Sequence, residues 1–202
     1  SIPGRNIGIA TGAYCNDNVI TGCYVLCNGY SSHCVSSGRG YNNLIEHTTV
    51  RNTGPGFANR CQFESGGFML DNHVEAETPS GQYNVRLYDC DVLQTPHFGI
   101  YAAGRDRTAE GYPDNYGVFQ IEACTVVVSS KNIVYTGTGA TCTGRTNCYG
   151  IEIVRGGPDT YIKHGHITAD EGNHGGRGVM LVGTNGTQAN PLVLCSTYVS
   201  MH

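Results

Sequence analysis

The sequence predicts an all-β fold: a right-handed parallel β-helix of about six to seven coils, formed by residues 1–202 as one domain. Two observations predict it. One template of apolar positions repeats along the chain, and runs that begin with glycine and an apolar residue recur between its copies. Repetition of one small unit is typical of a solenoid, in which each coil buries its apolar side chains against the next coil.

The repeat is a template of four positions. Its last position is Val or Ile, and the other three lie two, five and seven residues earlier. Two pairs of alternate positions, separated by a step of three, describe two short strands that meet at a bend and point every second side chain inward. Seven segments fit the template, and they end at Val25, Val50, Val74, Val92, Val126, Ile167 and Val199.

A third strand is expected between successive segments, because three short strands per coil and a return to the same position describe a parallel β-helix. The spacing of the segments makes the first three coils compact. It places loop insertions in the C-terminal half, at residues 105–115, 131–148 and 185–191. The third strands are clearest at Gly8-Ile9, Gly99-Ile100, Gly150-Ile151 and Gly178-Val179.

This organisation resembles the pectin lyase-like superfamily, which includes polysaccharide lyases, glycoside hydrolases and bacteriophage tailspikes. The resemblance covers nearly the whole chain and rests on the repeat pattern. It implies a protein that binds a long polysaccharide, and the tailspike type implies a homotrimer at a virion surface or elsewhere outside the cell. Fold alone does not determine function, so the site residues must be found separately.

Composition excludes some classes of partner. Charged residues make up 14% of the chain, with 29 Gly and 13 Tyr, so the surface suits neutral polar ligands better than polyanions. The net charge is −4, and the two lysines, Lys131 and Lys163, form no basic stripe for nucleic acid. No apolar run approaches the ~20 residues needed to span a bilayer.

Five of the ten cysteines fall into two kinds. Cys23, Cys90 and Cys124 fall on inward template positions, where a thiol acts as a small buried apolar group. Cys142 and Cys148 bracket a short segment rich in Thr and Gly, and a disulfide between them would close a small loop.

Carboxylates at outward positions beside the third core column are the candidate catalytic groups. Coils stack about 4.8 Å apart, so Asp71 and Asp89 are expected to lie close together. Two carboxylates at such a distance are what glycoside hydrolysis requires, whereas a lyase would use a basic side chain. The alternative interpretation is that these carboxylates belong to an ordinary solvated strand face and have no catalytic role. No cofactor is indicated, except that Asp89 and Asp91 could contribute to a Ca²⁺ site. The candidates are Glu46, Asp71, Asp89, Asp91 and Glu122.

Aromatic and basic residues at outward positions are the candidate carbohydrate-binding groups. Exposed tyrosine rings are flat platforms for sugar rings, and their hydroxyls stay in water. Histidine and arginine on the same coils can donate hydrogen bonds to sugar hydroxyls. These candidates are Tyr24, His73, Arg86, Tyr88, Tyr101, His164 and His166.

Two features predict association between copies of the chain. Five bulky residues share one outward template position and form an apolar stripe that suits the axis of a trimer. Neither end has an amphipathic cap, so the chain is expected to be a segment of a longer solenoid or a subunit that stacks end to end. The stripe consists of Val19, Leu44, Phe68, Tyr161 and Val193.

Two functional hypotheses follow. The first is an extracellular or virion protein of the tailspike type that binds a cell-surface polysaccharide, with cleavage by a hydrolase or lyase as an extension. The second is a structural subunit that stacks end to end into a filament or fibre.

Overall fold

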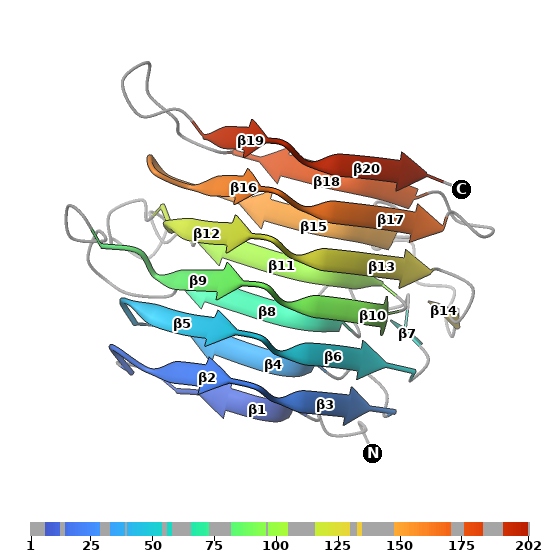
Figure 1. Cartoon of the computed structure of the whole chain (residues 1–202), viewed down its shortest axis with the longest axis horizontal. Coiled ribbons are helices and arrows are strands. Elements are labelled where there is room, and N and C mark those ends of the chain that lie inside the picture. The colour runs from blue at the N-terminus through green and yellow to red at the C-terminus, as the bar shows by residue number, and fades with distance from the viewer. Residues whose placement is uncertain are drawn as a thin grey trace.

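A computed structural model of the chain confirms the parallel β-helix. It describes residues 7–12, 15–28, 33–38, 40–53, 56–57, 66–72, 82–95, 97–104, 116–129, 133–134, 148–170, 176–183 and 192–201. Every regular element within these residues is a strand, and three parallel sheets of six strands form the body of the molecule. Six coils stack along one axis, from the blue N-terminal coil to the red C-terminal coil (Figure 1).

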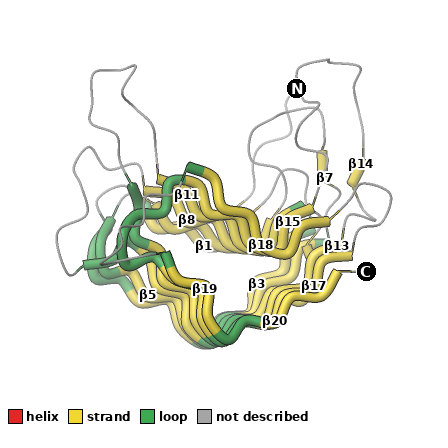
Figure 2. The backbone as a smooth tube through the Cα atoms, turned by 90° about the horizontal axis from the view of Figure 1, so that it is seen from above, coloured by secondary structure: helices red, strands yellow, loops and turns green. Residues whose placement is uncertain are grey.

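Each coil contributes one strand to each of three sheets. Sheet A consists of β1 (Ile7–Thr11), β4 (His33–Gly38), β8 (Gly66–Asn72), β11 (Phe98–Gly104), β15 (Cys148–Val154) and β18 (Gly176–Val182). Sheet B consists of β2 (Val19–Thr21), β5 (Asn43–Glu46), β9 (Val85–Tyr88), β12 (Phe119–Glu122), β16 (Tyr161–Lys163) and β19 (Val193–Cys195). Sheet C consists of β3 (Tyr24–Cys27), β6 (Thr49–Asn52), β10 (Asp91–Thr95), β13 (Thr125–Ser129), β17 (His166–Asp170) and β20 (Tyr198–Met201). Seen along the stack, sheet A lies across the core from a V formed by sheets B and C (Figure 2).

The core consists of columns of inward side chains, and the column in sheet C is the Val/Ile column of the template. Its central members, Val50, Val92, Val126 and Ile167, are at most 1% exposed. They stack directly, because each pairs in register with its neighbour on the next coil. Six of the seven template segments are therefore confirmed as strand pairs of sheets B and C.

The bend between sheets B and C is made by a residue with positive φ in every coil. The bend residues have φ between 47° and 64°, and they are Gly22, His47, Asp89, Ala123, His164 and Ser196. This conformation costs a non-glycine residue roughly 1–2 kcal/mol. Hydrogen bonds to the next coil offset the cost: the His47 N–H donates to the Tyr88 carbonyl at 3.1 Å, and the Asp89 N–H donates to the Glu122 carbonyl at 3.0 Å.

The glycine that begins each predicted third strand lies where sheet A approaches sheet C. A Cβ atom on Gly99 would collide with the Val126 side chain and would lie 2.7 Å from the Gly150 carbonyl oxygen. A Cβ atom on Gly150 would collide with Ile167. The glycine-apolar pairs at Gly99 and Gly150 therefore mark third strands because a side chain would collide at the first position, although in β4 the same register column holds the buried Cys34.

One template segment was wrongly predicted. Residues 67–72 belong to β8 in sheet A, where Phe68 pairs with Val35 and Ile100 and is fully buried. Val74 lies outside the described residues. The first three template positions accept small, polar and apolar residues alike, so Gly67, Met69 and Asn72 fit it without forming a bend. The prediction of three compact initial coils is wrong for the same reason, since long connections precede and follow β8.

The connections differ sharply around the coil. Sheets B and C are joined by two residues in every coil, whereas the longer connections all begin or end at a strand of sheet A. The predicted insertions at 105–115 and 185–191 lie outside the described residues. Within 131–148, β14 (Ile133–Val134) is described, and it pairs in parallel with β7 (Gly56–Phe57) outside the three-sheet body (Figure 2).

The positive-φ bends predict opposite effects of exchanging alanine and glycine. Gly22→Ala should destabilise the protein by about 1 kcal/mol through backbone strain alone, because nothing lies within 4 Å of the added Cβ. Ala123→Gly should stabilise it by less than about 1 kcal/mol, because the freedom of glycine in the unfolded chain offsets part of the relieved strain. Urea unfolding of both variants measures the difference, and equal effects of the same sign would contradict this account.

Candidate functional site

The outer face of sheet B carries a linked set of polar and aromatic side chains, which we name the B face. Strand alternation places them there: in β9, Val85 and Leu87 point into the core, so Arg86 and Tyr88 point outward. Two register columns on coils two to five supply the other members. The B face consists of Glu46, Arg86, Tyr88, Glu122, Tyr161 and Lys163.

An ion pair forms the centre of the B face. Arg86 Nη2 lies 2.9 Å from Glu122 Oε2, and the two side chains are 37% and 24% exposed. The Tyr161 hydroxyl donates to the same Glu122 oxygen at 3.3 Å. The Lys163 ammonium lies 4.1 Å from the centre of the Tyr161 ring. The Glu122 carboxylate thus contacts both the Arg86 guanidinium and the Tyr161 hydroxyl, and the Lys163 ammonium lies over the Tyr161 ring.

Tyr88 lies at the middle of this arrangement. It pairs in register with Glu46 on one side and Glu122 on the other, so its ring stands between two carboxylate-bearing residues on adjacent coils. The Arg86 guanidinium carbon lies 5.7 Å from its ring centre. Tyr88 is 37% exposed, so an aromatic residue bordered by charged groups faces solvent.

Charge coupling in the B face changes two pKa values. Burial raises the pKa of Tyr161, with the Arg86 cation acting in the opposite direction. Burial acts to lower the pKa of Arg86, but Tyr161 and Glu122 outweigh it and the pKa of Arg86 is raised. The tyrosine therefore keeps its proton and the guanidinium its charge, so hydrogen-bond donors are maintained at neutral pH.

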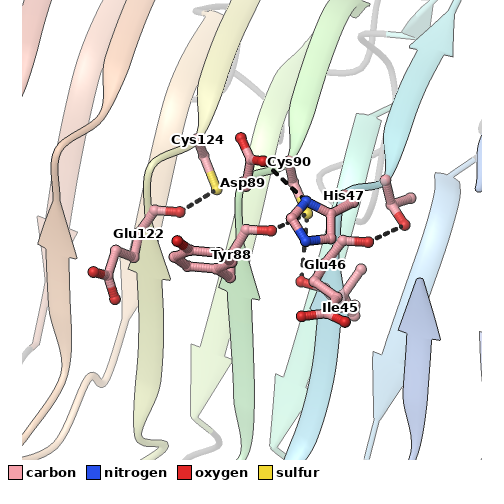
Figure 3. A network of polar contacts seen from close by, with 9 residues as sticks. Ile45, Glu46, His47, Tyr88, Asp89, Cys90, Glu122 and Cys124 are labelled. Atoms are coloured by element: carbon pink, nitrogen blue, oxygen red, sulfur yellow. Dashed lines mark hydrogen bonds and ion pairs between the residues drawn. The ribbon is translucent and has the colours of Figure 1, made fainter. Parts of the chain in front are cut away.

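The bend beside the B face carries a second pair, His47 and Asp89. His47 Nδ1 lies 2.9 Å from Asp89 Oδ2, and the two side chains are 52% and 61% exposed. The His47 ring meets the Tyr88 ring edge-on at 6.0 Å. Figure 3 shows this pair next to Glu46, Tyr88 and Glu122. Both residues are bend residues with positive φ that lie between sheets B and C, so the pair extends the B face toward sheet C.

The remaining predicted residues of the template columns lie elsewhere on the surface. Tyr24 and Asp91 belong to one outward column of sheet C, in register with Thr49, so they are separated from Tyr88 by the bend. His166 belongs to the same column and meets Tyr198 edge-on at 4.9 Å. His164 is the bend residue of the fifth coil.

Asp71 and Tyr101 lie on sheet A. Asp71 pairs in register with Gly38 and Ala103, so the predicted stacking of Asp71 on Asp89 is wrong; the neighbour of Asp89 is His47. Tyr101 points outward as predicted but is only 9% exposed, because it packs with Phe98 at 5.7 Å between ring centres.

The sequence interpretation missed Glu152, which is in register with Tyr101 and only 6% exposed. The feature of the sequence that could have indicated Glu152 is its position two residues after Gly150, in a predicted third strand. It lies on the outer face of sheet A near the buried rings of Phe98, Tyr101 and Tyr149, which form a second apolar cluster with Met69. This face is a packed layer rather than a solvated surface.

The predicted apolar stripe is also corrected. Val19, Leu44, Tyr161 and Val193 do share one column of sheet B, but Arg86 and Gln120 occupy its middle. Phe68 is in the core and contributes nothing to it. The outside of sheet B is therefore polar at its centre and apolar only toward its ends.

The inward thiols are confirmed. Cys90 and Cys124 are 1% and 2% exposed, and Cys23 packs partly against the core. The Cys124 thiol donates to the Glu122 carbonyl at 3.3 Å (Figure 3). Its hydrogen bond with Cys90, together with burial, raises its pKa, so it remains an unreactive apolar group. His73 and Cys142 lie outside the described residues; Cys148 begins β15, so the predicted disulfide stays a prediction.

Comparisons with protein families, with curated proteins and with solved structures give no match for this chain. In the described part of the chain, no cluster of three or more His, Cys, Asp or Glu side chains is suited to hold a metal ion. A membrane-crossing helix is likewise not found among the described residues.

The ion pair of the B face predicts measurable coupling between Arg86 and Glu122. In a double-mutant cycle of Arg86→Ala and Glu122→Ala, the coupling free energy should be about 0.5–1 kcal/mol, because the pair is only partly buried. Unfolding free energies at low and high salt measure it, and high salt should reduce it. Additive single-variant effects at low salt would show that the pair contributes nothing.

Proposed function

We propose that this protein binds an extended polysaccharide outside the cell, as a β-helix similar to the tailspike type of the pectin lyase-like superfamily. The single observation that carries the proposal is the B face: an exposed tyrosine ring between two glutamates, joined to an arginine–glutamate–tyrosine network over adjacent coils. The low charge and the Tyr-rich composition of the chain favour a neutral or weakly charged ligand.

Each group of the B face matches one need of sugar recognition. A pyranose ring has an apolar face that stacks on an aromatic ring, which suits Tyr88. Its hydroxyl groups both donate and accept, which suits the fixed donors of Arg86 and the acceptors of Glu46 and Glu122. Because these groups are held on stacked strands, little side-chain freedom is lost on binding. The B face extends over coils two to five along the axis, a length that suits a polymer better than a single sugar.

Cleavage of the bound polymer is the extension of this proposal. Asp89 and Glu122 lie on adjacent coils, joined by the bend hydrogen bond, and coils stack about 4.8 Å apart. Glycoside hydrolysis uses two carboxyl groups separated by about 5–9.5 Å, one as acid and one as base or nucleophile. Asp89, partnered by His47, and Glu122, partnered by Arg86, are the pair that we assign to these roles.

Binding is tested by affinity electrophoresis in gels that contain a neutral bacterial surface polysaccharide, with polygalacturonate as the acidic comparison. Tyr88→Ala should weaken binding about tenfold, the loss of roughly 1.4 kcal/mol of stacking and contact. Tyr198→Ala removes a tyrosine of sheet C that is 60% exposed, against 37% for Tyr88, and should leave binding unchanged. Equal retardation of the wild type and Tyr88→Ala by every polysaccharide that binds would remove the B face as the site.

Cleavage is tested by measuring new reducing ends after incubation with the polysaccharide that binds best. Asp89→Asn and Glu122→Gln should each lower the rate by at least about 100-fold, because each removes a proton-transfer or nucleophilic group. Asp17→Asn is the matched control: Asp17 also has positive φ, 58°, and is exposed on the first coil. Undiminished release by Asp89→Asn would exclude this residue pair, and binding without release would leave recognition as the whole function.

A further inference from the structure

The C-terminal coil exposes side chains that point toward the solenoid axis. Leu181, Leu194 and Val199 occupy inward columns, and they are 44%, 51% and 40% exposed. The residues directly below them on the previous coil are Ile153, Ile162 and Ile167, and these are at most 1% exposed. The same columns are therefore buried one coil earlier and exposed on the last described coil.

The three strands of this coil also end their sheets. β18, β19 and β20 are the last strands of sheets A, B and C, so among the described residues no strand pairs with their outer edges. β1, β2 and β3 are the end strands at the opposite end of the stack. Backbone groups at such edges are ready to pair with a further parallel strand.

The first coil carries apolar residues in the same columns as the last coil, so the two coils could stack on one another. Aligning β19 and β20 with β2 and β3 by their shared columns sets Val193 over Val19, Leu194 over Ile20, Tyr198 over Tyr24 and Val199 over Val25. Bend residue Ser196 falls over bend residue Gly22, and both have positive φ. In sheet A, Val179 falls over Ile9.

We propose that the C-terminal coil binds the N-terminal coil of a second copy of this chain, head to tail, and so continues the parallel sheets and the core columns. Apolar positions meet apolar positions, the bends coincide, and tyrosine stacks beside tyrosine on the outer face of sheet C. The contact joins two different surfaces of the chain, so it does not close on itself and generates a linear filament. It is independent of the B face, whose residues lie on coils two to five.

The interface is tested with two end-blocked variants, studied by sedimentation and light scattering. Leu194→Lys places a charge on the C-terminal coil, and Ile20→Lys places one on the N-terminal coil. The wild type should exceed the 21.6 kDa of one chain increasingly as concentration rises, whereas each variant alone should stay at that mass. An equimolar mixture should form one discrete species of twice that mass, because each variant keeps the end that the other has lost.

Leu93→Lys is the matched control. Leu93 is 45% exposed on the third coil, so the same change there should leave assembly intact. Melting curves establish that each variant is folded; Leu194 is half exposed, so its replacement should alter melting little.

A cross-link gives a second test that does not depend on the blocked variants. In the proposed contact Cys195, a free and exposed thiol, lies over Thr21 of the next copy. Strands pair about 4.8 Å apart, within the range that a disulfide spans. Thr21→Cys treated with diamide, which takes up the two electrons and two protons of the thiol pair, should give a ladder of covalent multimers. The further change Cys195→Ser should abolish the ladder.

Three results would overturn the proposal: a wild-type chain that stays at 21.6 kDa at every attainable concentration, assembly of Leu194→Lys equal to that of the wild type, or dimers of Ile20→Lys alone. The last would show that two C-terminal coils bind each other instead. Loss of polysaccharide binding would affect none of these readouts, so the two proposals fail separately.

Discussion

The in-register stacking of the coils through their bends is the constraint on which the rest of the structure depends. The non-glycine bend residues accept an unfavourable backbone conformation, and the N–H of the bend residue in each of the first five coils donates to a carbonyl of the next coil. Because sheets B and C are joined by two residues in every coil, neither strand can shift without its partner. A shift of one residue would turn the core side chains outward. The apolar columns and the bends therefore enforce the same register.

The same constraint explains why functional groups gather where they do. At a two-residue bend, and on the short strands beside it, outward side chains on adjacent coils are held at the spacing of the strands. Arg86 meets Glu122 and His47 meets Asp89 across such steps, although these partners lie 36 and 42 residues apart in the chain. Rigid stacking thus creates a preorganised surface from residues that no local motif connects.

The sequence predicted the fold well because both of its signals are local. Alternation within a strand and the step at a bend can both be recognised within eight consecutive residues. The glycine of a third strand such as β11 or β15 is required where sheet A approaches one side chain of sheet C. Which residues are neighbours on adjacent coils is not a local property, because it depends on counting correctly the coils that separate two residues in the chain. The false segment at Val74 inserted one coil too many, and it placed Asp71 where His47 lies. The His47–Asp89 pair was missed for this reason, whereas the packed outer side of sheet A has no periodic signal.

The glycines where sheet A passes sheet C have one more consequence. They bring the two sheets so close that Val126 and Ile167 fill the space in which side chains of sheet A would otherwise stand. Within the described residues, the central coils are therefore filled by side chains rather than hollow. An added coil would lengthen this filled core without widening it.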